Sequence, residues 1–194
     1  MRITKRPDER RAELLGAARA LFDERGVEKT RVSDIVGRVG VAQGVFYYYF
    51  RSKDEIVRAV TEQVEDEIRV QAAAILGMQA GFSKKLSAFI DLYIGVIDQF
   101  LGDDETSLTA LEAGMGRARF PAHRAQALLA ECLVQLAERA AADGELAVEY
   151  PGQTALVLLY GLHRLAADRL PKRNMIHAIA EQCLGLAKGS LASP

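Results

Sequence analysis

The strongest constraint on the fold of this chain is the segment TRVSDIVGRVGVAQGVFYYYFRSK at residues 30–53. It reads as two short helices around a glycine turn, because an apolar face that includes Ile35 and Val36 ends before Gly40 and a second pattern then begins. The chain has seven Phe and six Tyr, and five of these form one run at residues 46–50. A helix that packs on one face must turn part of this run outward, where it can contact another molecule.

Helical periodicity covers nearly the whole sequence and strand signals are scarce, so we predict an all-α protein of about nine helices. Three helices should form the N-terminal part, at about residues 7–25, 30–39 and 42–49. A long fourth helix should run from about 53 to 76 and link this part to a larger helical body. Five more helices are expected at about 86–97, 106–118, 121–142, 153–170 and 174–188. We therefore predict two domains, residues 1–52 and residues 53–194.

Several helix ends carry recognisable signals. Pro7 suits the first position of the first helix, and Gly26 stands where a C-cap glycine would end it. Thr30 is a candidate N-cap for the second helix, and Ser52 is the candidate for the fourth.

The net charge of −1 is distributed unevenly. Residues 1–58 carry a net charge of +4 and the remainder carries −5, by counting Lys and Arg against Asp and Glu. A basic N-terminal part on an acidic body fits local contact with a polyanion. Ordinary scatter of surface charge is the alternative reading of this number.

The two cysteines, Cys132 and Cys183, lie far apart within apolar helical patterns, and we expect both to be core thiols. Neither belongs to a motif with metal-ligand spacing, so we expect no metal and no cofactor. No run of 18 apolar residues is present, and the first residues lack the apolar core of a signal peptide. We expect a cytoplasmic protein with no membrane partner.

A helix, a turn that contains glycine and a second short helix form the helix-turn-helix pattern, whose second helix enters the DNA major groove. At 100° per residue, Phe46 and Phe50 share the inward face of that helix. Gly44 and Tyr48 fall on the opposite face. Tyr47 and Val45 lie on the two shoulders, Tyr49 points sidelong, and Gln43 stands at the N-terminal tip.

The outward residues suit contact with bases. Gln43 can form a bidentate pair with adenine, and Gly44 lets the helix backbone approach closely. Val45 can pack on a thymine methyl group. Tyr47 and Tyr48 offer an apolar ring with a hydroxyl group, although packing against the fourth helix is the alternative for both.

Other polar residues stand at helix starts or flanks, where phosphates are commonly bound. Together with the outward residues they give the candidate DNA-binding set: Thr30, Arg31, Gln43, Gly44, Val45, Tyr47, Tyr48, Tyr49 and Lys53. Basic residues at positions 2, 5 and 6 could also follow the DNA backbone, or form a solvated tail.

Residues from about 10 to 60 resemble the N-terminal DNA-binding domain of the TetR family of transcriptional regulators. The shared motifs are LFDERG in the first helix, T-x-V-S-D-I in the second, the G-V-A-Q-G turn, and Y-x-Y-F-x-S-K-D-E before the fourth. Two positions depart from the family pattern: Val45 stands where Thr is usual, and Phe46 stands where Leu is usual. Val45 removes a hydroxyl group and any hydrogen bond that it would make.

The resemblance implies a small-molecule inducer that binds inside the body and moves the fourth helix. An effector of mainly hydrophobic character fits the aromatic residues of the body. The candidate pocket residues are Phe82, Phe89, Tyr93, Phe100, Met115, Phe120, His123 and His163. For each of them, plain packing in the core is the alternative.

The predicted eighth helix is apolar on two sides and must be covered twice. One cover is its own domain, and the second is a neighbouring helix or a second copy of the chain. Twofold dimers are the commonest oligomers, and the ninth helix could complete such an interface. The candidate interface residues are Leu158, Leu162, Leu165, Ile176, Ile179 and Cys183.

We therefore interpret the chain as a dimeric repressor that a small ligand releases from palindromic double-stranded DNA. An effector-independent DNA-binding regulator is one alternative. An α-helical enzyme is another, but the sequence offers no nucleophile beside a base and no phosphate-binding loop, so we identify no catalytic residue.

Overall fold

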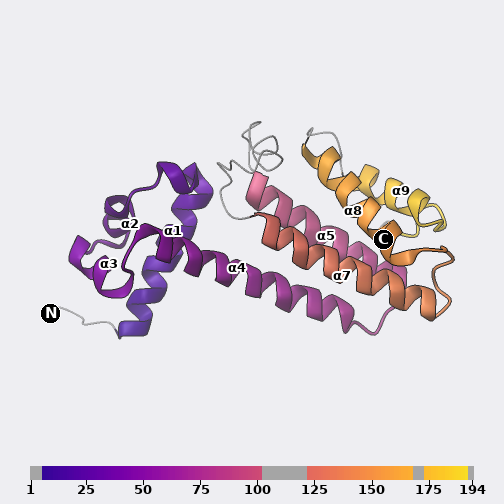
Figure 1. Cartoon of the computed structure of the whole chain (residues 1–194), viewed down its shortest axis with the longest axis horizontal. Helices are drawn as coiled ribbons and strands as arrows, with labels where there is room; N and C mark the ends of the chain where they lie inside the picture. The colour runs from indigo at the N-terminus through magenta and orange to yellow at the C-terminus, as the bar shows by residue number, and fades with distance from the viewer. Residues whose placement is uncertain (1–5, 102–121, 168–172, 192–194) are drawn as a thin grey trace. The chain divides into compact units, whose positions relative to one another are not determined.

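The computed structural model (Figure 1) describes residues 6–101, 122–167 and 173–191. Within these ranges it contains eight α-helices and no strand, which confirms the all-α fold. The sixth predicted helix, at residues 106–118, lies outside the described residues. The helices are α1 (Pro7–Lys29), α2 (Val32–Val39), α3 (Gln43–Tyr49), α4 (Lys53–Leu76), α5 (Phe82–Leu101), α7 (Ala122–Ala142), α8 (Pro151–Ala167) and α9 (Arg173–Cys183).

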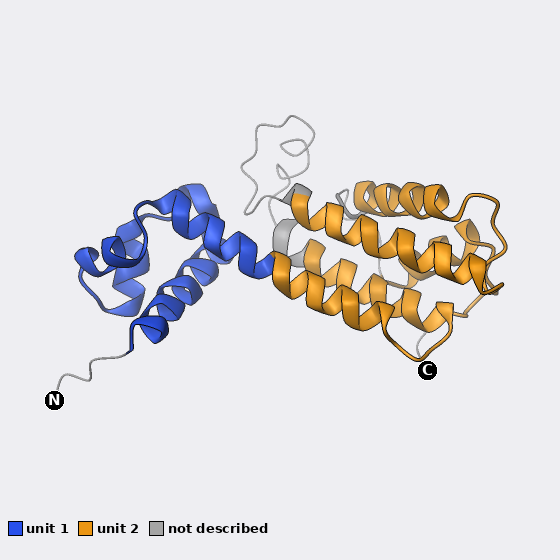
Figure 2. Cartoon of the chain, turned by 60° about the horizontal axis from the view of Figure 1, so that its bottom comes forward, with its two compact units in different colours: residues 1–64, 102–122 blue, residues 65–101, 123–194 orange. Residues whose placement is uncertain are grey.

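The chain divides into two compact units, coloured separately in Figure 2. Unit 1 comprises Met1–Val64 and Gly102–Ala122, and unit 2 comprises Glu65–Leu101 and His123–Pro194. The division falls within α4, later than the predicted boundary between residues 52 and 53. The first part of α4 belongs to unit 1 because Ile56 and Val60, both 0% exposed, are part of its core.

The helix α1 begins and breaks where the sequence signals predict. Pro7 occupies its first turn, and the Glu9 carboxylate accepts a hydrogen bond from the Arg6 N–H at 3.3 Å. Gly26 leaves helical geometry with φ 82° and ψ 160°, and one further turn runs to Lys29.

The prediction that Thr30 caps α2 is wrong. The N-cap is Arg31, whose N–H donates to Asp34 Oδ2 at 2.8 Å. Thr30 is 0% exposed, and its hydroxyl donates to the carbonyl oxygens of Gly26 at 2.8 Å and Leu21 at 3.3 Å. These carbonyls lie where α1 breaks, so Thr30 joins the end of α1 to the start of α2.

Two ion pairs also connect α1 with α2. Arg25 Nη2 lies 2.8 Å from Asp34 Oδ2, and Arg38 Nη2 lies 2.6 Å from Glu24 Oε1. The hydrogen bond from Arg38 lowers the pKa of Glu24. Both pairs are solvent-accessible, so they orient the two helices more than they stabilise them.

The turn between α2 and α3 depends on Gly40. This residue adopts φ 73° and ψ 38°, the left-handed conformation that ends many helices. The following N–H, of Val41, donates to the Val36 carbonyl at 3.0 Å, which closes the helix end. The chain then enters α3 at Gln43, as predicted.

The start of α4 is fixed by a capping arrangement. Ser52 Oγ accepts a hydrogen bond from the Glu55 N–H at 3.2 Å, which confirms the predicted cap. The Glu55 carboxylate accepts from the Arg51 N–H at 2.6 Å. The bond to Ser52 satisfies an N–H group that a helix start leaves without a partner, and the bond from Arg51 fixes the residue before the cap.

In unit 2, the remainder of α4 and the helices α5, α7 and α8 lie alongside one another, and α9 contacts α5 and α8 (Figures 1 and 2). The core between them includes Phe89, Tyr93 and Leu159, each at most 1% exposed. The buried Glu65 of α4 lies 3.0 Å from Arg124 Nε on α7. This ion pair connects α4 to α7 inside unit 2.

The helix α9 ends at Cys183, earlier than the predicted end near residue 188. The cause is Gly185, which takes φ 63° and turns the chain. Leu191 then returns to the core at 1% exposure. Cys132 is buried as predicted, but Cys183 is exposed, so the prediction of two core thiols is wrong for Cys183.

The glycine requirement at Gly40 can be tested against Gly37 in the same helix. A Cβ added at either position meets nothing within 4 Å, so the two substitutions differ only in backbone conformation. Gly40→Ala should destabilise by about 1–2 kcal/mol, because an L-residue resists the left-handed conformation. Gly37→Ala should stabilise by about 0.5–1 kcal/mol, because alanine favours the helix. Thermal unfolding followed by circular dichroism measures both, and equal effects would contradict this account.

Candidate nucleic-acid interface

The helix α3 presents the face that the helical geometry predicts. Phe46 and Phe50 are 0% and 1% exposed and fill the core of unit 1. Tyr48 is 78% exposed and Tyr47 is 52% exposed. These exposures exclude the alternative in which both tyrosines pack against α4. Burial of Phe46 and Phe50 thus turns Tyr47 and Tyr48, two of the three rings between them, toward the surface.

The exposed rings are held by their neighbours. The Tyr48 ring meets the half-buried Tyr49 ring edge-on, with centroids 4.8 Å apart. The Tyr47 ring meets the buried Phe46 ring in the same manner at 5.4 Å. Edge-to-face pairs of this kind restrict the aromatic side chains, so a partner that binds here meets partly ordered rings.

The start of α3 is open to solvent. Its N-cap is Ala42, which provides no side-chain hydrogen bond, and Gln43 and Gly44 are exposed. Val45 is half-buried. A Cβ on Gly44 would meet nothing within 4 Å, so the packing of the chain itself does not require glycine there. The absent side chain instead leaves room for the close approach of another molecule.

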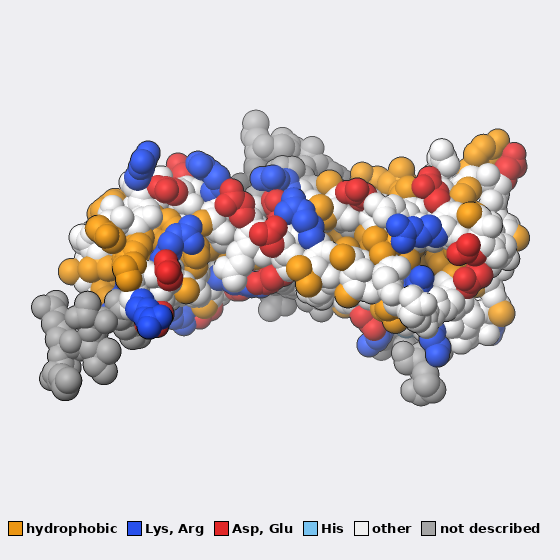
Figure 3. Space-filling view, turned by 90° about the horizontal axis from the view of Figure 1, so that it is seen from below, with side chains coloured by type: hydrophobic (Ala, Val, Ile, Leu, Met, Phe, Trp, Pro, Cys, Tyr) orange, Lys and Arg blue, Asp and Glu red, His pale blue; other side chains and the backbone are white. Residues whose placement is uncertain are grey.

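Basic residues stand beside this helix. Arg31 is exposed at the N-cap of α2. Lys53 is half-buried at the start of α4, with Nζ 3.4 Å from the Glu28 carbonyl oxygen at the end of α1. Arg51, close to Lys53 in the sequence, is also exposed, but it was not among the DNA-binding residues predicted from the sequence. Its signal was a basic residue directly before a capped helix start. Figure 3 shows Lys and Arg side chains around hydrophobic surface on the N-terminal unit.

Thr30 must be removed from the candidate contacts. Its side chain is fully buried and its hydroxyl donates to main-chain carbonyls within the chain. A phosphate cannot reach it without opening the junction between α1 and α2.

The core of α3 is supported from α1. The guanidinium carbon of Arg11 lies 5.1 Å from the centroid of the Phe50 ring. A cation over an aromatic face is attracted by the negative charge of that face. This contact ties α1 to the residue that follows α3, and it was not foreseen from the sequence.

The candidate pocket residues fall into three groups. Phe82, Phe89 and Tyr93 are 3%, 1% and 1% exposed, and the rings of Phe89 and Tyr93 stack with centroids 6.4 Å apart. His163 is half-buried. The side chains of Phe100, Met115, Phe120 and His123 lie outside the described residues.

Two polar atoms in this core have no hydrogen-bond partner among the described residues: Tyr93 Oη and His163 Nδ1. Burial raises the pKa of the Tyr93 hydroxyl and lowers the pKa of the His163 imidazole. Both shifts favour the neutral forms. The unit 2 core therefore contains two neutral polar groups that could bond to a molecule other than the chain.

Three of the six candidate dimer residues are buried within the single chain. Leu158 and Leu162 are 4% and 1% exposed within the single chain, and Ile176 of α9 is 3% exposed. A second copy cannot contact these three without opening the core. The chain itself covers parts of both apolar sides of α8, because Leu159 on the other side is 0% exposed. Of the other candidates, Leu165 and Ile179 are half-buried and Cys183 is exposed.

Large apolar side chains do remain at the surface of unit 2. Val157 and Tyr160 of α8 are 74% and 55% exposed, and Met175 of α9 is 41% exposed. Among the described residues, no helix is long and apolar enough to cross a membrane. In the same residues, no group of three or more His, Cys, Asp or Glu side chains is placed to hold a metal ion.

Comparison with known proteins identifies the N-terminal segment. Residues 14–60 match the family model described as "Bacterial regulatory proteins, tetR family". The HTH-type transcriptional repressor KstR2 of Mycobacterium tuberculosis is 43% identical over 56 residues, which cover 29% of this chain and 28% of KstR2. The matched segments span only 26–33% of the first curated relatives, so the likeness is confined to the helix-turn-helix end.

Solved structures extend the likeness of fold to nearly the whole chain. A TetR family regulator from Agrobacterium tumefaciens has a TM-score of 0.69 at 21% identity, over 93% of this chain and 98% of the other. RolR in complex with resorcinol has a TM-score of 0.55 at 16% identity, over 97% of this chain and 95% of the other.

The residues that match the family model include the exposed helix α3, the Gly40 turn and the capped start of α4. This match favours a regulator over the α-helical enzyme that the sequence left open. Residues 14–60 therefore form a helix-turn-helix segment that matches the TetR family of bacterial regulatory proteins, and the fold of the whole chain is similar to that of a solved TetR family regulator.

Proposed function

We propose that this chain is a dimeric repressor that binds a palindromic operator and is released by a small, mainly hydrophobic ligand. The proposal that the chain binds DNA rests on the exposed face of α3, where Tyr48 is 78% exposed and Gln43 and Gly44 are also exposed. The repressor role is supported by KstR2, a named repressor that is similar over the DNA-binding segment.

The contacts divide into two kinds. Gln43, Val45, Tyr47 and Tyr48 face the base edges in the major groove, where side chains can distinguish sequences. The second kind of contact binds phosphates and fixes the position of the protein on the duplex. It comes from Arg31, Tyr49, Arg51 and Lys53. The absent Cβ of Gly44 brings the helix close enough for the base contacts.

A twofold dimer would place two α3 helices about 34–36 Å apart, the distance between successive major grooves on one side of DNA. The exposed Val157, Tyr160 and Met175 support an interface built from α8 and α9, because burying them gains about 25 cal/mol per Å² of apolar surface. This surface replaces the buried residues that the sequence analysis selected.

The effector would occupy the core of unit 2. A ligand with one or two polar groups could bond to Tyr93 Oη and His163 Nδ1, which have no partner among the described residues. The structure of RolR with resorcinol supports this reading, because a protein of similar fold holds a small molecule. A ligand that binds one position of α4 better than another shifts DNA affinity by that difference, typically by about 1–3 kcal/mol.

The operator test combines selection with one substitution. DNA selected from a random pool by the purified chain should contain two inverted half-sites about 10–10.5 base pairs apart, centre to centre. On that DNA, Tyr48→Ala should weaken specific binding by about 1–3 kcal/mol and change non-specific binding little, because the ring meets base edges. Tyr150→Ala removes a ring that is 60% exposed in unit 2 and should leave both affinities unchanged. An unchanged ratio of specific to non-specific affinity for Tyr48→Ala would contradict the placement of α3.

Phosphate contact by Lys53 predicts a change in salt dependence. Lys53→Ala should weaken binding to all sequences and reduce the log–log salt slope by about one unit, because one fewer counterion is released. Lys84→Ala, at an exposed position of α5, should leave the slope unchanged. Titrations at several salt concentrations measure both slopes, and an unaltered slope for Lys53→Ala would show that Lys53 does not touch phosphate.

The unpaired Tyr93 hydroxyl makes a prediction about stability. Tyr93→Phe should leave the free energy of unfolding unchanged or raise it by up to about 1 kcal/mol, because it removes a buried polar group that lacks a partner. Thr30→Val is the matched control: its hydroxyl donates to two carbonyls, so its loss should cost about 1–2 kcal/mol. Urea unfolding measures both. A comparable loss in Tyr93→Phe would mean that the hydroxyl is bonded within the chain and not reserved for a ligand.

A further inference from the structure

A pocket of about 430 Å³ lies against α9, outside the site assigned to the effector. Its volume lies within the range of about 300–1,000 Å³ that is usual for small-molecule sites. The polar residues that line it are Arg173, Asn174, His177 and Glu181 of α9, with Lys188 from the turn that follows. Nothing in the DNA-binding or effector functions uses these side chains.

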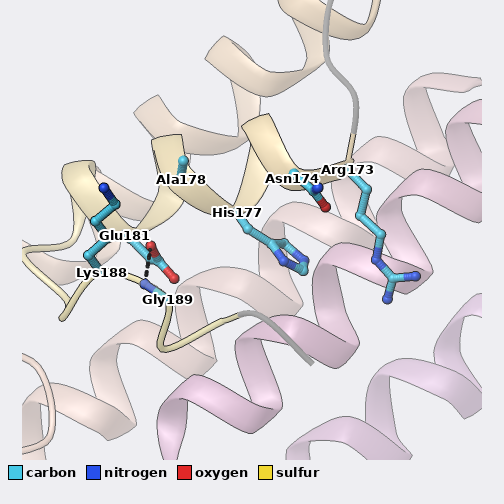
Figure 4. A pocket seen from close by; sticks show the side chains of 7 residues that line it. All are labelled: Arg173, Asn174, His177, Ala178, Glu181, Lys188 and Gly189. Carbon is cyan, nitrogen blue, oxygen red and sulfur yellow. Dashed lines mark hydrogen bonds between the residues drawn. The ribbon is translucent and has the colours of Figure 1, made fainter. Parts of the chain in front are cut away.

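The imidazole of His177 is the most informative group in this pocket. It is 7% exposed, and its Nε2 is enclosed without a hydrogen-bond partner among the described residues. Figure 4 shows the ring projecting from α9 into the space between Arg173 and the Glu181 carboxylate. A buried polar nitrogen without a partner costs about 1–3 kcal/mol, so a partner from outside the chain would remove this cost.

One wall of the pocket is fixed by Glu181. Its carboxylate oxygens accept hydrogen bonds from the N–H groups of Gly189 and Leu191, both at 2.9 Å. The bonds from Leu191 and then Gly189 lower the pKa of Glu181, so the group is ionised at neutral pH. Both oxygens are already engaged, and the turn that carries Lys188 is held in place beside α9.

The opposite wall is fixed by Arg173, whose Nη2 forms an ion pair with Asp91 of α5. An arginine has five N–H groups, and an ion pair of this kind leaves others for a second acceptor. Arg173 is also 52% exposed, so a ligand can reach it from solvent. Figure 4 places Arg173 on one side of the His177 imidazole and the already bonded Glu181 carboxylate on the other, with Asn174 next to Arg173 on α9 and Lys188 beyond Glu181.

We propose that this pocket binds a small molecule that carries an oxyanion, either a carboxylate or a phosphate. Arg173 supplies charge-assisted hydrogen bonds to the oxyanion, and the Asn174 amide adds a neutral donor. His177 Nε2 bonds to the enclosed part of the ligand. This site is distinct from the core of unit 2 that contains Tyr93, so the chain would hold two different ligands.

The test uses the full chain labelled with ¹⁵N, and the imidazole resonances of its three histidines. Benzoate and phenyl phosphate are the anionic probes, and benzamide is the neutral probe of similar shape, all at one pH and ionic strength. Either anionic probe should shift the His177 signals in a saturable manner and leave the His163 signals unmoved. Whichever of benzoate and phenyl phosphate has the lower dissociation constant identifies the preferred oxyanion. Equal shifts with benzamide, or no saturable shift with either anion, would overturn the proposal.

Matched substitutions at exposed positions locate the site. Arg173→Gln should weaken binding of the anionic probe by about tenfold, through loss of a charge-assisted hydrogen bond, and Lys188→Gln, which lies beyond Glu181, should weaken it less. Lys84→Gln removes an exposed charge of α5 that does not line the pocket and should leave the affinity unchanged. Equal affinities in all three variants would show that the probe binds elsewhere and would refute the assignment.

Discussion

The burial of Phe46 and Phe50 is the interaction on which the DNA-binding surface depends. Both rings are at most 1% exposed in unit 1, and transfer of a large side chain to the interior contributes about 1.5–3 kcal/mol. Because Phe50 directly follows α3 and its N–H donates to the Phe46 carbonyl at 2.9 Å, the burial of both rings fixes the rotation of α3 about its own axis. The exposure of Tyr47 and Tyr48 follows from that rotation. The contact of Arg11 with the Phe50 ring and the Thr30 hydroxyl bonds hold the surrounding helices in the matching arrangement.

Thr30 in unit 1 and three groups in unit 2 show different relations between polar groups and burial. In unit 1 the buried hydroxyl of Thr30 is bonded to main-chain carbonyls, so it stabilises the junction of α1 and α2. In unit 2 the atoms Tyr93 Oη, His163 Nδ1 and His177 Nε2 are enclosed and lack partners among the described residues. A buried hydroxyl that is hydrogen-bonded within the chain, as in Thr30, suits a rigid DNA-binding part. Enclosed groups without partners are suited to a body that exchanges hydrogen bonds with small molecules.

The sequence predicted unit 1 better than unit 2, for physical reasons. Glycine and proline signals placed Pro7, Gly26 and Gly40 correctly, and the helical angle predicted which aromatic residues are buried. Thr30 was misassigned because a hydroxyl can bond either to the helix that follows or to the helix before it, and spacing does not distinguish these. Leu158 was assigned to a dimer because an apolar stripe does not reveal whether its cover comes from the same chain. The α9 pocket combines a helix with a turn shaped by Gly185, and only tertiary structure brings those parts together.

The contrast between the two cysteines has a practical consequence. Cys132 is 2% exposed, and burial together with the nearby Glu131 charge raises the pKa of its thiol to about 11. Thiol reagents attack the thiolate, so Cys132 should resist them while the exposed Cys183 reacts. The natural chain therefore accepts a single spin label or fluorophore at the end of α9 without any substitution. In a twofold dimer, the two labels would report one distance between the subunits. A change in that distance when a ligand is added would measure the movement of one subunit relative to the other.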